Sequence, residues 1–230
     1  MSTIKIELNN GEILKVSSGN GKMGNLPSLS TSCLESSFCQ KMHSLKENVC
    51  SHCYAWKNLK LYSANREMCK NNYNILTSRI LEENETLAIA KALANQKYLR
   101  LEAFGELEQG SKGQIQLGNY YNIAKALKRY DVIVVLWSKN IATLKSFFET
   151  HKMLANFKII LSSYQVNKPL NAEHLPEVLK TCKTFTVVDS NSELAPKRNC
   201  FGGCNGVTCA SCQLCYAKNK IQEIIEMLRA

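Results

Sequence analysis

Four short apolar runs alternate with helical patterns through the middle of this chain, and this alternation constrains the fold more than any other feature. The runs are residues 98–104, 132–137, 157–162 and 184–188. Helical spacing follows the first three runs, with stripes formed by Tyr120, Ala124 and Leu127, by Ile141, Leu144 and Phe148, and by Leu175, Val178, Leu179 and Cys182. Strands buried on both faces of a parallel sheet read as continuous apolar runs. The sequence therefore predicts an α/β fold whose parallel βα units form an incomplete or irregular TIM-barrel-like domain.

We expect one domain over residues 1–230. Residues 1–16 alternate in polarity around Asn10-Gly11, a dipeptide that favours a tight hairpin turn. Residues 17–60 lack a sustained period and form a cysteine-rich loop, and the βα units occupy residues 65–190. They are preceded by a helix that carries Cys69, Tyr73, Leu76 and Ile80. A second cysteine-rich loop spans residues 199–217, and residues 219–230 are predicted to form a C-terminal helix bearing Ile221, Ile224, Ile225 and Leu228.

The composition, 45% hydrophobic and 21% charged, is that of an ordinary globular protein. The longest apolar run, residues 132–137, is much shorter than the ~20 residues of a membrane span, so no membrane association is expected. Charges near the amino terminus replace the apolar stretch of a signal peptide. We therefore expect a cytoplasmic protein whose 11 cysteines stay reduced and can ligate a metal.

Nine of the 11 cysteines lie in the two irregular loops, whereas Cys69 and Cys182 fall on apolar helix stripes and are expected in the core. The C-terminal loop holds Cys200, Cys204, Cys209, Cys212 and Cys215. Cys209, Cys212 and Cys215 match the C-x2-C-x2-C part of the bacterial ferredoxin pattern, which binds a 4Fe-4S cluster. Cys204, Cys209 and Cys212 also fit the C-x4-C-x2-C order of a two-iron cluster. The crowding favours iron–sulfur over zinc, whose two ligand pairs usually lie farther apart.

The N-terminal loop contributes Cys33, Cys39, Cys50 and Cys53. Only Cys50 and Cys53 form a short-spaced pair, so a structural zinc site remains an alternative to an iron–sulfur cluster here. His43 is a lesser ligand candidate. A nearby G-x-G-x-x-G match, residues 19–24, is not followed by a helix start, and we predict no nucleotide site there.

The carboxyl ends of parallel strands are the expected place for functional groups. Glu106 follows the first apolar run and Lys139 follows the second. A carboxylate and an ammonium group at this edge could shift each other's pKa and orient a polar substrate or cofactor, although such residues are more often solvated loop charges.

A net charge of +10 leaves a second functional class open. Basic residues are interspersed with aromatic ones in the segment that contains Lys57, Lys60, Arg66, Lys70, Tyr54, Trp56 and Tyr62. Basic groups neutralise phosphates and aromatic rings stack on exposed bases. The alternative prediction is a zinc-stapled nucleic-acid-binding module.

Several of these segments together resemble a known family. They are residues 19–24, Cys33, Cys39, the run Cys53-Tyr54-Ala55, residues 100–106, residues 137–139, and Cys200, Cys209, Cys212 and Cys215. In this order they resemble the bacteriophage gene product 88 family over about residues 17–217. The resemblance implies a phage-encoded, barrel-like α/β protein that holds an iron–sulfur cluster and has no firmly assigned reaction.

The same layout is distantly similar to the radical S-adenosylmethionine enzymes. That chemistry needs three cysteine ligands and one open iron, and the C-x3-C-x2-C motif is missing from this chain. Each loop instead offers four thiols, which favours an iron–sulfur protein without the radical mechanism.

Overall fold

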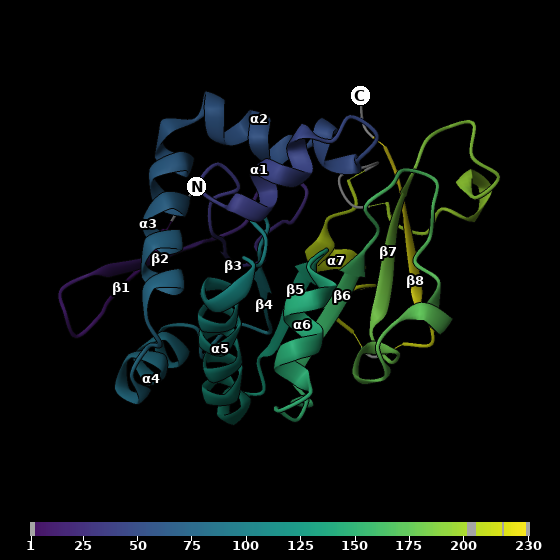
Figure 1. Ribbon diagram of the computed structural model, residues 1–230. Coiled ribbons are helices and arrows are strands. Elements are labelled where there is room, and N and C mark those ends of the chain that lie inside the picture. Colours follow the sequence, from purple (N-terminus) through teal and green to yellow (C-terminus); the bar gives the residue numbers. More distant parts are fainter. Residues whose placement is uncertain (1–2, 202–205, 218, 229–230) are drawn as a thin grey trace.

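The computed structural model describes residues 3–201, 206–217 and 219–228, and its strands form one eight-stranded sheet in chain order (Figure 1). The strands are β1 (Thr3–Glu7), β2 (Ile13–Ser17), β3 (Ser28–Leu29), β4 (Tyr98–Leu101), β5 (Ile133–Ser138), β6 (Phe157–Ser162), β7 (Lys183–Val188) and β8 (Glu223–Met227). The α-helices are α1 (Ser37–Ser44), α2 (Tyr54–Leu61), α3 (Ser63–Ser78), α4 (Glu83–Ala92), α5 (Gly110–Leu127), α6 (Ile141–Phe148) and α7 (Cys209–Cys212).

The amino-terminal hairpin is confirmed. β1 and β2 pair antiparallel with Thr3 opposite Ser17 and Glu7 opposite Ile13, and β2 also meets β3 antiparallel. From β3 to β8 every pairing is parallel, so the predicted parallel sheet is confirmed as well. Within the described residues the pairings run from β1 to β8 and include none between these two edge strands.

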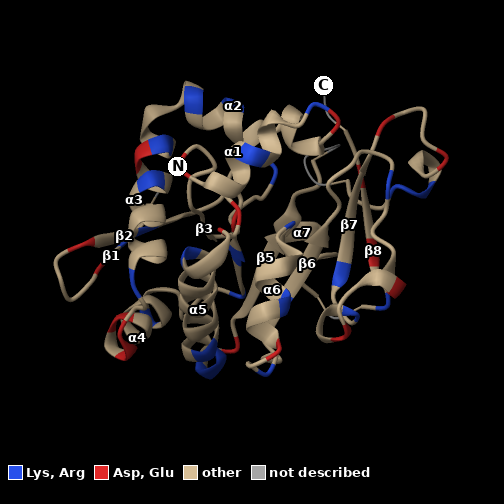
Figure 2. Ribbon diagram, viewed as in Figure 1, with Lys and Arg blue, Asp and Glu red and all other residues tan. Residues whose placement is uncertain are grey.

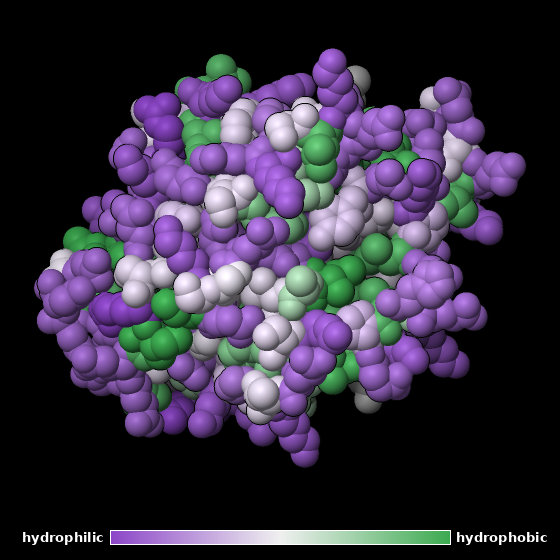
Figure 3. Space-filling view, in the orientation of Figure 1, coloured by the Kyte–Doolittle hydropathy of each residue, from purple (hydrophilic) through white to green (hydrophobic). Residues whose placement is uncertain are grey.

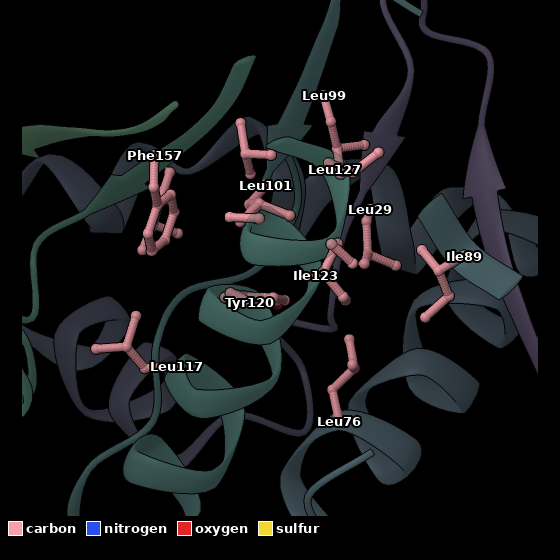
Figure 4. Packing of buried hydrophobic residues seen from close by; sticks show 14 of the residues in the cluster. Leu29, Leu76, Ile89, Leu99, Leu101, Leu117, Tyr120, Ile123, Leu127 and Phe157 are labelled. Carbon is pink, nitrogen blue, oxygen red and sulfur yellow. The ribbon is translucent and has the colours of Figure 1, made fainter. Parts of the chain in front are cut away.

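One face of the sheet is covered by helices, which Figure 1 shows as α5 and α6 in front of the strands. Leu99 and Leu101 of β4 point to this side, where they meet Tyr120 and Ile123 of α5 (Figure 4). The same core takes in residues of α3, α4 and α6. We call this side the helix-covered face.

The opposite side, here the loop-covered face, is formed by the alternate residues of the same strands. Tyr98, Val135 and Ile160 lie in a second core together with buried residues of both cysteine-rich loops, including Cys33 and Cys215. Successive strand residues point to opposite faces, so a single strand supplies both cores. The two loops, far apart in the sequence, therefore share one side of the sheet.

Three sequence predictions about local structure are wrong. The predicted helix over residues 219–230 is wrong for residues 219–228, because residues 223–227 pair in parallel with residues 184–188 of β7 and make strand β8; residues 229–230 lie outside the described residues. The expected helix around Leu175 to Cys182 is replaced by two short 3-10 turns, Ala172–His174 and Glu177–Leu179, in a segment interrupted by Pro169 and Pro176.

The third correction concerns residues 17–60, which are less irregular than expected. They contain α1, α2 and a 3-10 turn, Val49–His52. The helix predicted next is α3, where Cys69, Tyr73 and Leu76 are buried. Ile80 lies beyond its end and is 48% exposed.

Candidate metal centre

The four N-terminal cysteines lie on the segment that follows β3, and we call them the N-terminal thiol group. Cys33 comes a few residues after β3, Cys39 is in α1, Cys50 is in the Val49–His52 turn, and Cys53 is the residue before α2. β3 is the first strand of the parallel part of the sheet, so this loop leaves the sheet at the carboxyl edge of its strands. The fold thus brings the predicted N-terminal ligands to the edge where parallel α/β sheets bind ligands.

Cys33 and Cys53 are in direct contact. A hydrogen bond from the Cys33 thiol lowers the pKa of Cys53 to about 6, and the same bond together with burial raises the pKa of Cys33. Cys39 and Cys50 are both close enough to Cys53 for their charges to interact. Of the two, Cys53 is thus the thiol whose deprotonated form, the form that binds metals, is favoured.

His43, the lesser ligand candidate, is held in this group by two contacts. Its Nδ1 lies 2.8 Å from the carbonyl oxygen of Cys50, and its ring stacks on Trp56 with 4.0 Å between the ring centres. A ring nitrogen facing a carbonyl oxygen donates its hydrogen. His43 thus links the Cys50 turn to α2.

Three buried glutamates of the segment between β4 and α5 hold the neighbouring backbone. Glu102 accepts hydrogen bonds from the Thr31 amide (3.1 Å) and hydroxyl (2.8 Å), just before Cys33. Glu108 accepts from the amide and hydroxyl of Ser37 (both 2.7 Å), at the first residue of α1. A carboxylate is favourable at a helix amino terminus. The glutamates thereby fix the start of the cysteine-rich loop and the helix that carries Cys39.

Glu102 is held from several sides. Its carboxylate also accepts hydrogen bonds from Gln116 (2.7 Å) and from the hydroxyl of Tyr120, both on α5. Burial raises the pKa of Glu102 to about 7, and the hydrogen bonds from Tyr120 and Thr31 oppose this rise. Gly105 lies against this network, since an added Cβ would be 2.3 Å from the Thr31 hydroxyl oxygen. Only glycine lets the two segments approach so closely.

Glu106 and Lys139, the predicted pair, do lie together beside the N-terminal thiol group. Glu106 is 6% exposed, and its Oε2 accepts a hydrogen bond from the backbone amide of Lys139 at 2.8 Å. The structure describes both residues and records no ion pair between their side chains. Burial raises the pKa of Glu106 and the Lys139 charge opposes this. The Lys139 charge also interacts with Cys50, Cys53 and Cys39.

The C-terminal thiol group consists of Cys200, Cys209, Cys212 and Cys215. Cys209 and Cys212 are the first and last residues of α7, and Cys200 and Cys215 are buried against the loop-covered face. Burial raises the pKa of Cys215 to about 12, and its nearby charged groups include the three other cysteines of this group. Cys204 was also predicted as a ligand, and it lies outside the described residues.

The glycine-rich residues 19–24 hold α7 in place. The backbone amide of Cys209 donates to the carbonyl oxygen of Lys22 (2.9 Å), and that of Ala210 donates to Met23 (3.1 Å). A Cβ on Gly24 would be 3.2 Å from the Cβ of Ala210. The N-terminal loop and the C-terminal thiol group are thus joined by backbone hydrogen bonds.

Basic side chains of the sheet point toward the C-terminal thiol group. Lys158 of β6 donates to the carbonyl oxygen of Tyr216 (2.9 Å), and Lys183 of β7 donates to that of Leu214 (2.8 Å). Arg100 of β4 stacks on Trp137, with 4.2 Å from its guanidinium carbon to the ring centre. Burial raises the pKa of Cys209, and the charge of Arg100 opposes this. Lys158 and Lys183 carry no motif in the sequence, and Arg100 is noticeable there only as the first residue of the segment 100–106.

The fit of these residues to a metal rests on their chemistry. Over residues 3–201, 206–217 and 219–228, no three His, Cys, Asp or Glu side chains are arranged to hold a metal ion as they stand. Each group nevertheless gathers four thiols, the donors preferred by zinc and by iron–sulfur clusters. Cys33, Cys39, Cys50, Cys53, Cys209, Cys212 and Cys215 are free thiols, so disulfides do not compete for them.

Some of the basic and aromatic residues near α2 already contact other side chains of the protein. Lys57 and Lys60 lie on α2, and Tyr62, between α2 and α3, is 58% exposed. The Trp56 ring stacks on His43, and the Nζ of Lys60 lies 5.4 Å from its centre. Figure 2 shows Lys and Arg spread over the molecule, and Figure 3 shows a largely hydrophilic face.

None of the helices in the described residues is long and apolar enough to cross a membrane.

Comparison with known proteins supplies the family. The comparisons with curated proteins and with solved structures find no match. A family model described as Gene product 88 matches residues 5–201, a range that contains the N-terminal thiol group, Glu106, Lys139 and Cys200 and ends before Cys204. Because the match covers most of the chain, the protein belongs to the phage gene product 88 family.

Proposed function

We propose that this protein binds iron–sulfur clusters, of the 4Fe-4S type, through its two thiol groups. The observation that carries the proposal is the contact between Cys33 and Cys53, which are 20 positions apart in the sequence and share one hydrogen bond, with Cys39 and Cys50 close by. Four thiols that gather at one place supply the donor set that iron–sulfur clusters use.

The C-terminal thiol group supports the same proposal through its spacing. Cys209, Cys212 and Cys215 follow the ferredoxin order, and Cys200 lies near Cys215 as a fourth donor. Four thiolates saturate a 4Fe-4S cluster, so its role is electron transfer or redox sensing rather than radical chemistry. Glu106 and Lys139, beside the N-terminal group, would orient a polar substrate or redox partner there.

The parallel strands β3 to β8, which follow one another without a change of order, support an incomplete barrel as the scaffold. We place the protein in the cytoplasm of the host cell, where thiols stay reduced.

Anaerobic purification tests the proposal directly. The expected result is a brown protein with visible absorption and with iron and acid-labile sulfide in equal amounts. Cys212→Ala should lower the iron content, whereas Cys182→Ala, a core thiol outside both groups, should leave it unchanged. A colourless protein with stoichiometric zinc would refute the iron–sulfur proposal in favour of zinc staples.

A nucleic-acid interface is the second candidate, and its support is the exposed Tyr62 beside Lys57 and Lys60. Binding through these residues should weaken as salt concentration rises, because it releases counterions from the phosphates. Retention on single-stranded DNA and RNA columns at low ionic strength measures this. A wild-type protein that elutes without delay at low salt excludes the candidate.

A further inference from the structure

Arg100 is a half-buried cation without an acidic partner among the described residues. Its Nε is buried and has no hydrogen-bond partner, and among the residues that the structure describes no carboxylate lies within 4.0 Å of its guanidinium group. Withdrawing part of a charge from water costs free energy unless an opposite charge compensates it. An anion beside Arg100 on the loop-covered face would supply that compensation.

The surroundings of Arg100 show where that anion must be. Its guanidinium group stacks on Trp137, and Trp137 in turn contacts the ring of Tyr216, the residue directly after Cys215. The Tyr216 hydroxyl is also buried without a partner, and the whole side chain is 1% exposed. The guanidinium group and this hydroxyl therefore lie close to each other, next to the C-terminal thiol group.

The other cations of this face have different partners. Lys158 and Lys183 donate to the backbone carbonyl oxygens of Tyr216 and Leu214, and Lys22 pairs with Glu226 at 2.5 Å. Arg100 alone among these four faces the thiols without a carbonyl or carboxylate acceptor for its Nε. Cys209 and Cys215 are among its nearest groups that can carry negative charge.

We infer that Arg100 is the counter-charge of the metal–thiolate centre formed by the C-terminal thiol group, and that it sets the reduction potential of that centre. This inference rests on the proposed iron–sulfur function. A 4Fe-4S cluster with four cysteine thiolates is anionic, and its one-electron reduction adds a further negative charge. A fixed positive charge beside it stabilises the reduced form more than the oxidised form, so it raises the reduction potential.

The test is an anaerobic redox titration with dithionite as the electron donor, followed by visible absorption and electron paramagnetic resonance. The signal lost in Cys212→Ala identifies the C-terminal centre. Arg100→Gln should shift the potential of this centre to more negative values, and Arg100→Lys, which keeps the charge, should stay close to wild type. Lys125→Gln removes one exposed positive charge from α5 on the helix-covered face and serves as the control, which should titrate as wild type.

Each outcome decides between the two proposals. Wild-type protein without iron and sulfide overturns the iron–sulfur function and with it the role of Arg100. A loaded Arg100→Gln protein with an unchanged potential overturns the role of Arg100 alone. If Arg100→Gln takes up no cluster while Arg100→Lys does, the charge is required for assembly and the inference stands. If both variants fail to take up a cluster, the guanidinium group is needed for packing and the counter-charge role is wrong.

Discussion

The thiol of Cys33 donates a hydrogen bond to the sulfur of Cys53 across the cysteine-rich loop that follows β3. This bond shifts the pKa values of two chemically identical side chains in opposite directions, up for Cys33 and down for Cys53. It also ties the start of the loop to the residue before α2.

The first prediction concerns the reactivity of Cys53 in metal-free protein. Because the hydrogen bond from Cys33 lowers the pKa of Cys53 to about 6, alkylation of Cys53 by iodoacetamide should have its midpoint near pH 6. In Cys33→Ala the donor is gone and the midpoint should move up toward pH 9. Mass spectrometry of the peptide that contains Cys53 measures both. Cys182→Ala is the control, and an identical midpoint in Cys33→Ala and wild type would contradict the contact.

The second prediction is a pH dependence of stability due to Glu102. Burial raises the pKa of Glu102 to about 7 from an ordinary 4.5, so the folded state binds a proton more tightly than the unfolded state. The contribution of Glu102 to the free energy of unfolding is then fully present below pH 4.5 and is lost as the pH rises to about 7. Urea unfolding at pH 5 and pH 7 should show this loss, and Glu102→Gln should remove it. A mutant with the same pH slope as wild type would assign the effect to another group.

Glu85 should make the stability of the fold depend on pH in the opposite direction. Two hydrogen bonds from Arg79, at 2.6 and 2.7 Å, lower the pKa of Glu85 to about 2. Its contribution is present above pH 4.5 and is lost as the pH falls toward 2. Glu85→Gln should therefore lower the free energy of unfolding by on the order of 2 kcal/mol at pH 7 and by much less near pH 3. Glu83→Gln, on the exposed side of the same helix, is the matched control and should have almost no effect.

The fourth prediction tests the close approach at Gly105. Its added Cβ would lie 2.3 Å from the Thr31 hydroxyl oxygen and 2.7 Å from the Thr31 carbonyl oxygen, and the carbonyl oxygen belongs to the backbone. Gly105→Ala should lower the free energy of unfolding by about 2 kcal/mol and reduce metal content, because Thr31 precedes Cys33. Gly21→Ala meets no atom within 4 Å and should be tolerated. Thermal unfolding and metal analysis compare the two variants. Equal stability of both would mean that the segments containing Gly105 and Thr31 can move apart without cost.

Local patterns were sufficient to predict the hairpin and the parallel strands. The apolar runs that form β4, β5 and β6 are continuous because each of these strands contributes side chains to two cores, one on each face of the sheet. A pattern of this kind can be recognised in the sequence, since an apolar side chain by itself indicates a buried position. The segregation of the cysteines into two loops was visible for the same reason.

The same local patterns misassigned residues 219–230. Ile221, Ile224 and Ile225 have a spacing that fits a helix as well as a strand, and only the free edge of β7 decides between them. Pairing with a strand some 40 positions away leaves no local signal. A run rich in isoleucine accommodates a strand readily once that edge is present.

Sequence alone therefore determined which side chains are chemically capable, namely the thiols, Glu106 and Lys139. Tertiary structure decided which of them meet. It placed both thiol groups on the loop-covered face, turned Glu102 and Glu108 into supports for the N-terminal loop, and brought Arg100 next to the C-terminal thiol group. The reason is physical: side-chain identity and periodicity are local properties, whereas hydrogen bonds and charge compensation depend on segments that come together only when the chain folds.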